Sequence, residues 1–118
     1  MNQGVPPEYQ RARNPLRPSA ETVAAGAAVY SENCAACHGD RGLGDGEAGR
    51  DLSPSPALLV YLMQMPMAAD EYLFWAISDG GTAFGTDMPA FKDTLVEEDI
   101  WKVITYMRAG LPQIAENQ

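Results

Sequence analysis

The sequence predicts an all-α domain preceded by an extended N-terminal arm. Three observations lead to this fold class. Apolar residues recur at helical spacing, helix capping and stop signals bracket the recurring segments, and no stretch shows convincing strand character. The length of 118 residues suits a single domain. We therefore expect residues 1–18 to form the arm and residues 19–118 to form one domain, with about four to five helices.

The arm is rich in proline and basic. Prolines stand at positions 6, 7, 15 and 18, where they block helix formation. Arg11, Arg13 and Arg17 against Glu8 give residues 1–20 a net charge of +2, whereas residues 21–118 carry a net charge of −10. We expect the arm to pack on the domain, to tether it to a larger complex, or to form a disordered leader.

The first helix is expected to begin at Ala20, with Ser19 as its cap. One face of this helix is apolar and points inward: Val23, Ala27, Tyr30 and Cys34. Gly26 interrupts the helix at a cost of about 1 kcal/mol relative to alanine. We interpret it as a point where another helix approaches closely, rather than as a merely tolerated glycine.

Two loops and two further helices follow. Residues 39–49 contain five glycines and form a loop whose pattern does not fit an EF-hand calcium site. A short helix is expected after Pro56. Another helix begins near Asp70 and ends before Gly80-Gly81, where glycine suits the cap. Residues 82–93 form the second loop.

The last helix is expected after a capping box formed by Thr94 and Glu97. It should end at Gly110 and Pro112. The residues expected to be buried on its apolar face are Ile100, Val103, Ile104, Met107 and Leu111.

All the cysteine and histidine of the chain lie within five residues, Cys34, Cys37 and His38. A redox dithiol usually occurs in a βαβ setting, which the sequence does not show. A structural zinc site normally takes four ligands; these residues supply three, and neither a third cysteine nor a second histidine is present. C-x-x-C-H is also the signature of covalent haem attachment, and we favour this interpretation over the other two.

A haem iron held by His38 needs a second axial ligand or keeps an open site, and bis-histidine ligation within the chain is excluded. Methionine is the natural candidate. Met88 lies in a loop between polar residues and Pro89, which stiffens the backbone after it. Met65, which also precedes a proline, is the alternative. Met107 is expected in the core.

Charge and hydropathy exclude several classes of protein. The net charge of −8 argues against a nucleic-acid-binding protein, which needs a basic surface. The longest apolar stretch, residues 57–67, is shorter than the about 20 residues that a membrane span requires. The N-terminus lacks the features of a secretory signal. The chain is therefore either cytosolic or a mature form.

The chain resembles a class I, mono-haem bacterial cytochrome c over residues 19–111. The matching stretches are GAAVYSENCAACHGDRGLGDG, LSPSP, DEYLFWAISDGG and TDMPAFKDTLVEEDIWKVITYMRAG, in that order. The resemblance implies the cytochrome c fold around one covalent haem c. Cys34 and Cys37 would carry the thioethers, and His38 and Met88 would be the axial ligands. It also implies that the first and last helices cross at Gly26 and Tyr30 against Val103 and Tyr106. A carbonyl of Pro54 or Pro56 would accept a hydrogen bond from His38.

The resemblance further implies a periplasmic one-electron carrier that cycles between Fe(II) and Fe(III) and is not an enzyme. Its signal peptide would have been removed. We expect redox protein partners with a basic docking surface, because the body is acidic. Two alternatives stay open. The chain is an electron-relay subunit of a larger dehydrogenase or oxidase complex, or it is a ligand sensor or enzyme in which Met88 is displaced.

Overall fold

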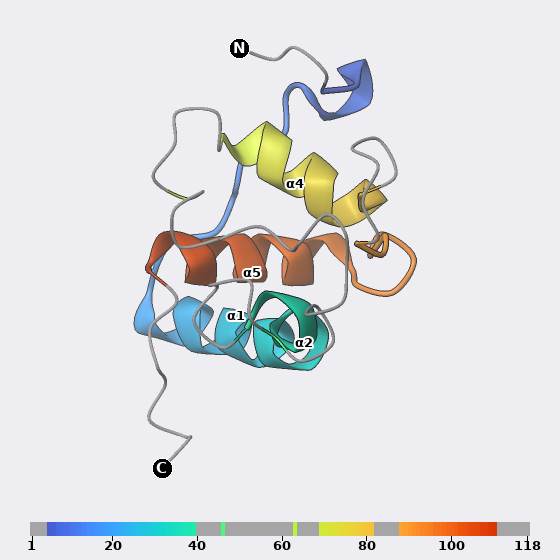
Figure 1. Cartoon of the computed structure of the whole chain (residues 1–118). Helices are drawn as coiled ribbons and strands as arrows, with labels where there is room; N and C mark the ends of the chain where they lie inside the picture. Colours follow the sequence, from blue (N-terminus) through green and yellow to red (C-terminus); the bar gives the residue numbers. More distant parts are fainter. Residues whose placement is uncertain (1–4, 40–45, 47–62, 64–68, 82–87, 111–118) are drawn as a thin grey trace.

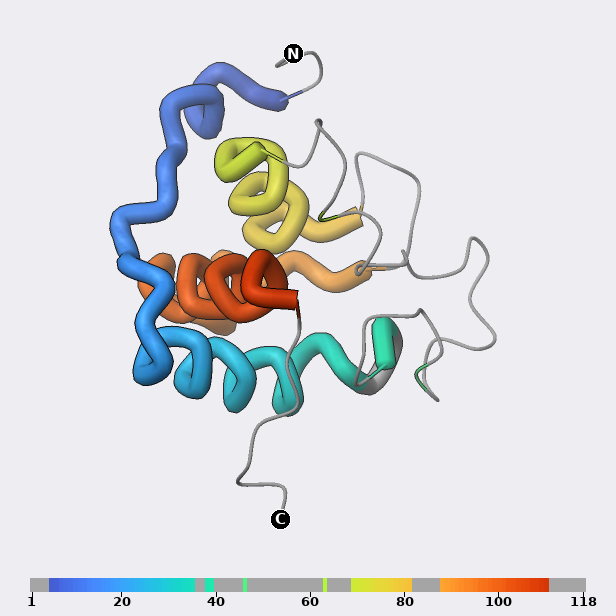
Figure 2. The backbone as a smooth tube through the Cα atoms, turned by 90° about the vertical axis from the view of Figure 1, so that its left-hand side faces the viewer, coloured from blue at the N-terminus to red at the C-terminus, as the bar shows by residue number. Residues whose placement is uncertain are grey.

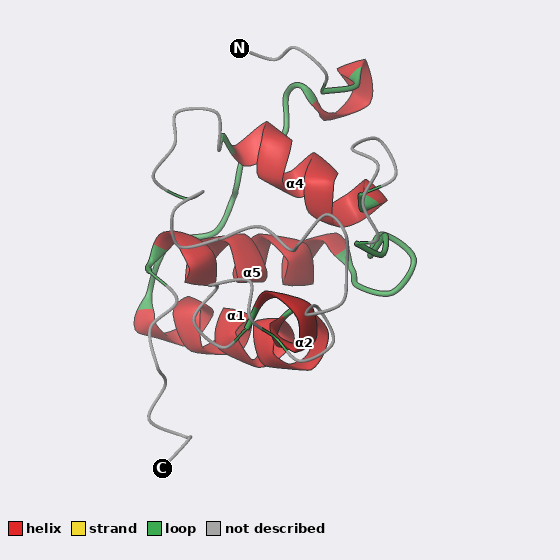
Figure 3. Ribbon diagram, in the orientation of Figure 1, coloured by secondary structure: helices red, strands yellow, loops and turns green. Residues whose placement is uncertain are grey.

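The computed structural model describes residues 5–39, 46, 63, 69–81 and 88–110, without the side chains of residues 36 and 37. The helices in these parts are η1 (Pro7–Tyr9, a 3-10 turn), α1 (Ala20–Asn33), α2 (Ala35–His38), α4 (Asp70–Asp79) and α5 (Glu97–Arg108). The described residues form helices and loops without a strand (Figure 3). The predicted all-α fold class is therefore confirmed. None of the helices within these ranges is long and apolar enough to cross a membrane.

Helix α5 lies between α4 and α1 in both views of the molecule (Figures 1 and 2). Because it is covered on two sides, it buries more than the single stripe of a surface helix. The buried residues of α5 are Ile100, Trp101, Val103, Ile104, Thr105, Tyr106 and Met107. The expected burial of Ile100, Val103, Ile104 and Met107 is thus confirmed, and Leu111 lies outside the described residues.

Helices α1 and α5 cross at Gly26. A Cβ added to Gly26 would overlap the carbonyl oxygen of Lys102 and lie 2.8 Å from the Cβ of Tyr106. The rings of Tyr30 and Tyr106 pack beside this point, with centroids 5.4 Å apart. Because any side chain at residue 26 would push the helices apart, the interpretation of this glycine as a close approach is confirmed.

The two long helices begin differently. The Ser19 side chain accepts a hydrogen bond from the Thr22 N–H at 3.1 Å, so the expected cap of α1 is confirmed. The capping box expected at Thr94 is wrong. The residue before α5 is Val96, which makes no side-chain cap, and the Thr94 N–H instead donates to the carbonyl of Phe91 at 3.0 Å. Acidic residues fill the first turn of α5 and interact favourably with the helix dipole there.

Helix α4 begins and ends as expected, at Asp70 and before Gly80. The helix after Pro56 falls outside the described residues. Leu73, Phe74 and Ile77 bring α4 into the apolar core. The Phe74 ring stacks on the indole of Trp101 in α5, with centroids 4.4 Å apart and planes inclined by 14°. This stacking fixes the distance between the two helices.

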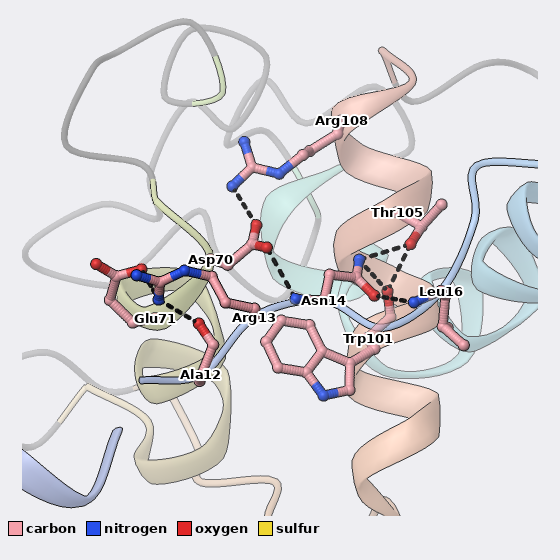
Figure 4. Close-up of polar contacts among 9 residues, drawn as sticks. All are labelled: Ala12, Arg13, Asn14, Leu16, Asp70, Glu71, Trp101, Thr105 and Arg108. Atoms are coloured by element: carbon pink, nitrogen blue, oxygen red, sulfur yellow. Dashed lines mark hydrogen bonds and ion pairs between the residues drawn. The ribbon is translucent and has the colours of Figure 1, made fainter. Parts of the chain in front are cut away.

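Residues 5–18 of the arm pack on the helices and run along one side of α4 and α5 to the start of α1 (Figure 2). The arm is not wholly extended, because Pro7, at the first helical position of η1, starts a turn that its ring geometry favours. Asn14 links both helices (Figure 4). Its N–H donates to Asp70 Oδ2 at 2.8 Å in α4, and its Nδ2 donates to Thr105 Oγ1 at 2.8 Å in α5.

Candidate functional site

The junction of α1 and α2 brings Cys34 and His38 one helical turn apart. The Cys34 N–H donates to the carbonyl of Tyr30 at 2.8 Å, and the His38 N–H donates to the carbonyl of Cys34 at 2.9 Å. The backbone hydrogen bonds therefore continue from one helix into the next. Both residues are 8% exposed. Cys37 belongs to α2, but its side chain is outside the description.

A buried tyrosine supports the end of this motif. The Tyr30 hydroxyl donates to the carbonyl of Gly39 at 2.6 Å, directly after His38. Gly39 has φ 85° and ψ 158°, a conformation that essentially only glycine adopts. The sequence indicated that Tyr30 faces inward, but it gave no sign of this hydrogen bond. The glycine after the histidine therefore turns the chain, and Tyr30 holds that turn against α1.

Met88 is half-buried and packs against the apolar core cluster to which Cys34 belongs. Its carbonyl accepts a hydrogen bond from the N–H of Gly81 at 2.9 Å. Figure 2 shows the segment that starts at residue 88 and helix α2 on the same side of the molecule. The structure thus places Cys34, with Ala35 beside it, and Met88 at one apolar cluster, although they are far apart in the sequence.

Met63 also borders this cluster, and Met107 is buried in it, as expected. Met65 and both prolines that were candidates to support the histidine, Pro54 and Pro56, lie outside the described residues.

Sequence reasoning missed the end of α4 as part of the site. Gly80 and Gly81 were interpreted only as a helix stop. In the structure their backbone contacts the segment that begins at Met88. The repeated glycine was the only signal for this contact, and nothing in its spacing indicated which segment would lie there.

A polar group ties the arm to the same end of α4. The Tyr9 hydroxyl donates to Asp79 Oδ1 at 2.9 Å, and Lys92 Nζ pairs with the same oxygen at 3.2 Å. Burial raises the pKa of Tyr9 to about 12, and the carboxylate of Asp79 contributes through its hydrogen bond and its charge. The phenol therefore stays protonated and keeps donating throughout the neutral range.

The described donors fit a covalent haem. The site offers a buried thiol in the apolar cluster, a buried imidazole one helical turn further along, and a thioether on a separate segment that packs against the cluster. Thiols can attach the macrocycle, and imidazole with thioether is a known axial pair for haem iron. The surrounding side chains are apolar and aromatic, which suits a large flat hydrophobic ring.

Comparisons with known proteins agree with this chemistry. The family described as "Cytochrome C oxidase, cbb3-type, subunit III" matches residues 21–107. Among solved structures, a chain of the reducing HAO-like protein complex of Kuenenia stuttgartiensis is similar, with 27% sequence identity and a TM-score of 0.67. The similarity covers 84% of this chain but 47% of that chain, so the present chain spans about half of its neighbour. No curated protein matches significantly.

The family match covers most of the chain, from the first turn of α1 to the last turn of α5. It includes the CAACH motif, Met88 and the glycine at the crossing of α1 and α5. On this ground the chain belongs to the family of cytochrome c domains described as cytochrome c oxidase, cbb3-type, subunit III.

Proposed function

We propose that this chain is a class I cytochrome c that carries a single haem and passes one electron at a time between protein partners. The family supports a c-type haem and haem electron transfer. The observation that carries the finer proposal is that Cys34 and His38 are buried one helical turn apart, and that Cys34 belongs to the apolar cluster that Met88 borders. That arrangement supports covalent attachment of the haem at Cys34, with His38 as one axial ligand and Met88 as the other.

Each of these residues has a defined role in the proposal. Cys34 and Cys37 form the thioether bonds, His38 presents its imidazole to one face of the iron, and Met88 presents its sulfur to the other. When bound, the haem supplies an iron that alternates between Fe(II) and Fe(III). Histidine with methionine raises the reduction potential relative to histidine alone or thiolate.

The protein around the site acts on the potential in two directions. The apolar cluster excludes water and disfavours the additional positive charge of the ferric state, which raises the potential. The net charge of −10 on residues 21–118 stabilises that charge and lowers the potential, and salt screens this second effect.

Replacing methionines one at a time tests the axial ligand. We expect Met88→Ala to lose the weak red sulfur-to-iron band of the oxidised protein and to lower its potential. Met65→Ala should keep both. Met63→Leu is the matched control, because Met63 borders the same cluster and leucine conserves its volume. If Met65→Ala loses the band and Met88→Ala keeps it, Met65 is the ligand.

We also propose that the chain is not an enzyme or a ligand sensor. An iron with both axial positions filled offers no open position to a small molecule. The ferrous protein should therefore be six-coordinate and low-spin and should not bind carbon monoxide readily. Rapid carbon monoxide binding by the wild-type protein would favour the sensor instead.

We propose that the carrier works in the periplasm and meets a basic docking surface on its partner. The acidic balance of the chain supports this partner, because opposite charges accelerate encounter. Salt screens such steering, so electron transfer to the partner should slow as ionic strength rises. A rate that stays constant or rises would contradict a basic partner. Fractionation of the native cells would test the compartment.

Membership of a larger redox complex is the second candidate. It is favoured by the structural neighbour, a chain of a protein complex, and by the description of the family as an oxidase subunit. Size-exclusion chromatography of the native protein distinguishes the two. A relay subunit elutes with a stable partner, whereas a carrier elutes alone as a monomer.

A further inference from the structure

The end of α4 carries a glycine that leaves no room for a side chain. Gly80 is buried and has φ 77° and ψ −161°, a region that essentially only glycine occupies. A Cβ added there would lie 2.7 Å from the carbonyl oxygen of Met88, the carbonyl carbon of Pro89 and the nitrogen of Ala90. All three are backbone atoms, so the whole segment would have to move.

The residue after this glycine holds the backbone of Met88 directly. The N–H of Gly81 donates to the carbonyl oxygen of Met88 at 2.9 Å. This bond and the close contact at Gly80 concern the same oxygen atom. The peptide group that follows Met88 therefore contacts both Gly80 and Gly81.

The chain beyond Pro89 is anchored to the same helix end. The N–H of Phe91 donates to the carbonyls of Ile77 and Ser78 at 3.1 and 3.2 Å, and the N–H of Lys92 donates to the carbonyl of Ser78 at 3.1 Å. The last carbonyls of a helix lack intrahelical partners, and here the segment supplies them. The Phe91 ring is buried in the core, which adds a side-chain anchor.

We propose that Gly80 is a positioning residue for the axial sulfur of Met88. It permits the backbone of Met88–Ala90 to lie against the end of α4, and so it decides where the thioether can reach. The inference rests on the proposed function only in taking Met88 as the ligand. It adds a residue that lies against the backbone of Met88–Ala90 and acts on the ligand through that backbone.

Gly80→Ala should weaken the bond between sulfur and iron without removing the haem. Forcing alanine into this conformation, or moving the segment away, disfavours the ligand-bound arrangement about 5- to 100-fold. The oxidised holoprotein should lose most of its red sulfur-to-iron band. Its ferrous form should bind carbon monoxide more readily, and its potential should fall towards that of Met88→Ala.

Gly110→Ala is the matched control. Gly110 also has a positive φ, 97°, but a Cβ there meets nothing within 4 Å. The Gly110→Ala variant therefore also places alanine at a positive φ, but its Cβ does not contact the segment of Met88. We expect this variant to keep the band and the potential of the wild-type protein.

The outcomes separate this inference from the proposed ligand. If Met88→Ala keeps the wild-type band, the ligand assignment fails and the inference fails with it. If Met88→Ala loses the band and Gly80→Ala keeps both band and potential, the ligand stands and the positioning role is overturned. Loss of the band in Gly80→Ala but not in Gly110→Ala supports it.

Amide hydrogen exchange provides a second measurement in case Gly80→Ala does not fold. In reduced Met88→Ala holoprotein the sulfur bond is absent, so the segment is held only by its contacts with α4 and the core. Protection of the Gly81 and Phe91 amide protons at the wild-type level would support the inference. Rapid exchange of both protons would overturn it, because the iron would then hold the segment and not the helix end.

Discussion

Replacing Gly26 by alanine should loosen the crossing of α1 and α5. The added Cβ would overlap the Lys102 carbonyl oxygen and lie 2.7 Å from its carbon and 2.8 Å from the Cβ of Tyr106. Carbon atoms in contact are normally about 3.5–4.0 Å apart, so the helices must separate by about 1 Å. Backbone atoms in the middle of a helix have no rotamer to change, and the displacement therefore spreads along the interface.

The structure gives the magnitude of this change. A leucine-sized patch holds about 4–12 kcal/mol of dispersion energy, and a gap of about 0.5–1 Å loses a quarter or more of it. Tyr30 and Tyr106, which flank Gly26, make up about two such patches, so about 2–6 kcal/mol is lost. Alanine has a higher helix propensity than glycine, which offsets about 1 kcal/mol of this loss. We expect a net loss of about 1–5 kcal/mol from the free energy of unfolding.

Urea unfolding of the holoprotein, followed by circular dichroism, measures this loss. With a slope of about 2 kcal/mol per molar urea, the midpoint should fall by about 0.5–2.5 M. Ala28→Gly, on the exposed side of α1, is the matched control and should cost only about 1 kcal/mol of propensity. Equal or greater stability of Gly26→Ala would refute the close packing of the two helices.

Three other perturbations test the remaining structure. Asn14→Ala removes the side-chain hydrogen bond to Thr105 and should lower the free energy of unfolding by about 1–3 kcal/mol, measured in the same urea assay; an unchanged midpoint would show that this hydrogen bond does not stabilise the domain. The pKa of Tyr9 is raised to about 12, so its contribution to stability is complete below about pH 10 and is lost as the pH rises to about 12. Stability measured across this range should fall less steeply in Tyr9→Phe, and parallel curves for the two proteins would contradict the hydrogen bond to Asp79. The chain without haem should be largely unfolded by circular dichroism, because the macrocycle would supply much of the apolar core; near-native helicity would contradict this.

Local chemistry explains why several predictions from the sequence are confirmed. Ser19 caps α1 through a bond to a residue three positions away. The apolar face of α5 follows from its period of 3.6 residues. The capping box at Thr94 was wrong for an instructive reason. The pattern of residue types was present, but the N–H of Thr94 bonds to Phe91 in a preceding turn, and the helix begins after Val96.

The candidate site likewise has one part that the sequence predicted and one part that it did not. The grouping of Cys34, Cys37 and His38 within five residues predicted haem attachment, because their spacing on the chain is itself the chemical requirement. The end of α4 as the support of Met88 was not predictable. The contacts between the end of α4 and the segment of Met88 join backbone atoms, which every residue has. The pattern of side chains therefore does not predict them.

By itself, the sequence determined the all-α class, the residue types at the candidate site and the glycine needed at a helix crossing. These depend on residue identity and on spacing over one or a few turns. Only the tertiary structure decided which helix meets Gly26, where the arm lies and what holds Met88. Asn14 bonds Thr105 across 91 positions, and Tyr9 bonds Asp79 across 70. Partners so far apart are selected by the packing of the whole domain, because no local preference of the chain distinguishes one distant acceptor from another.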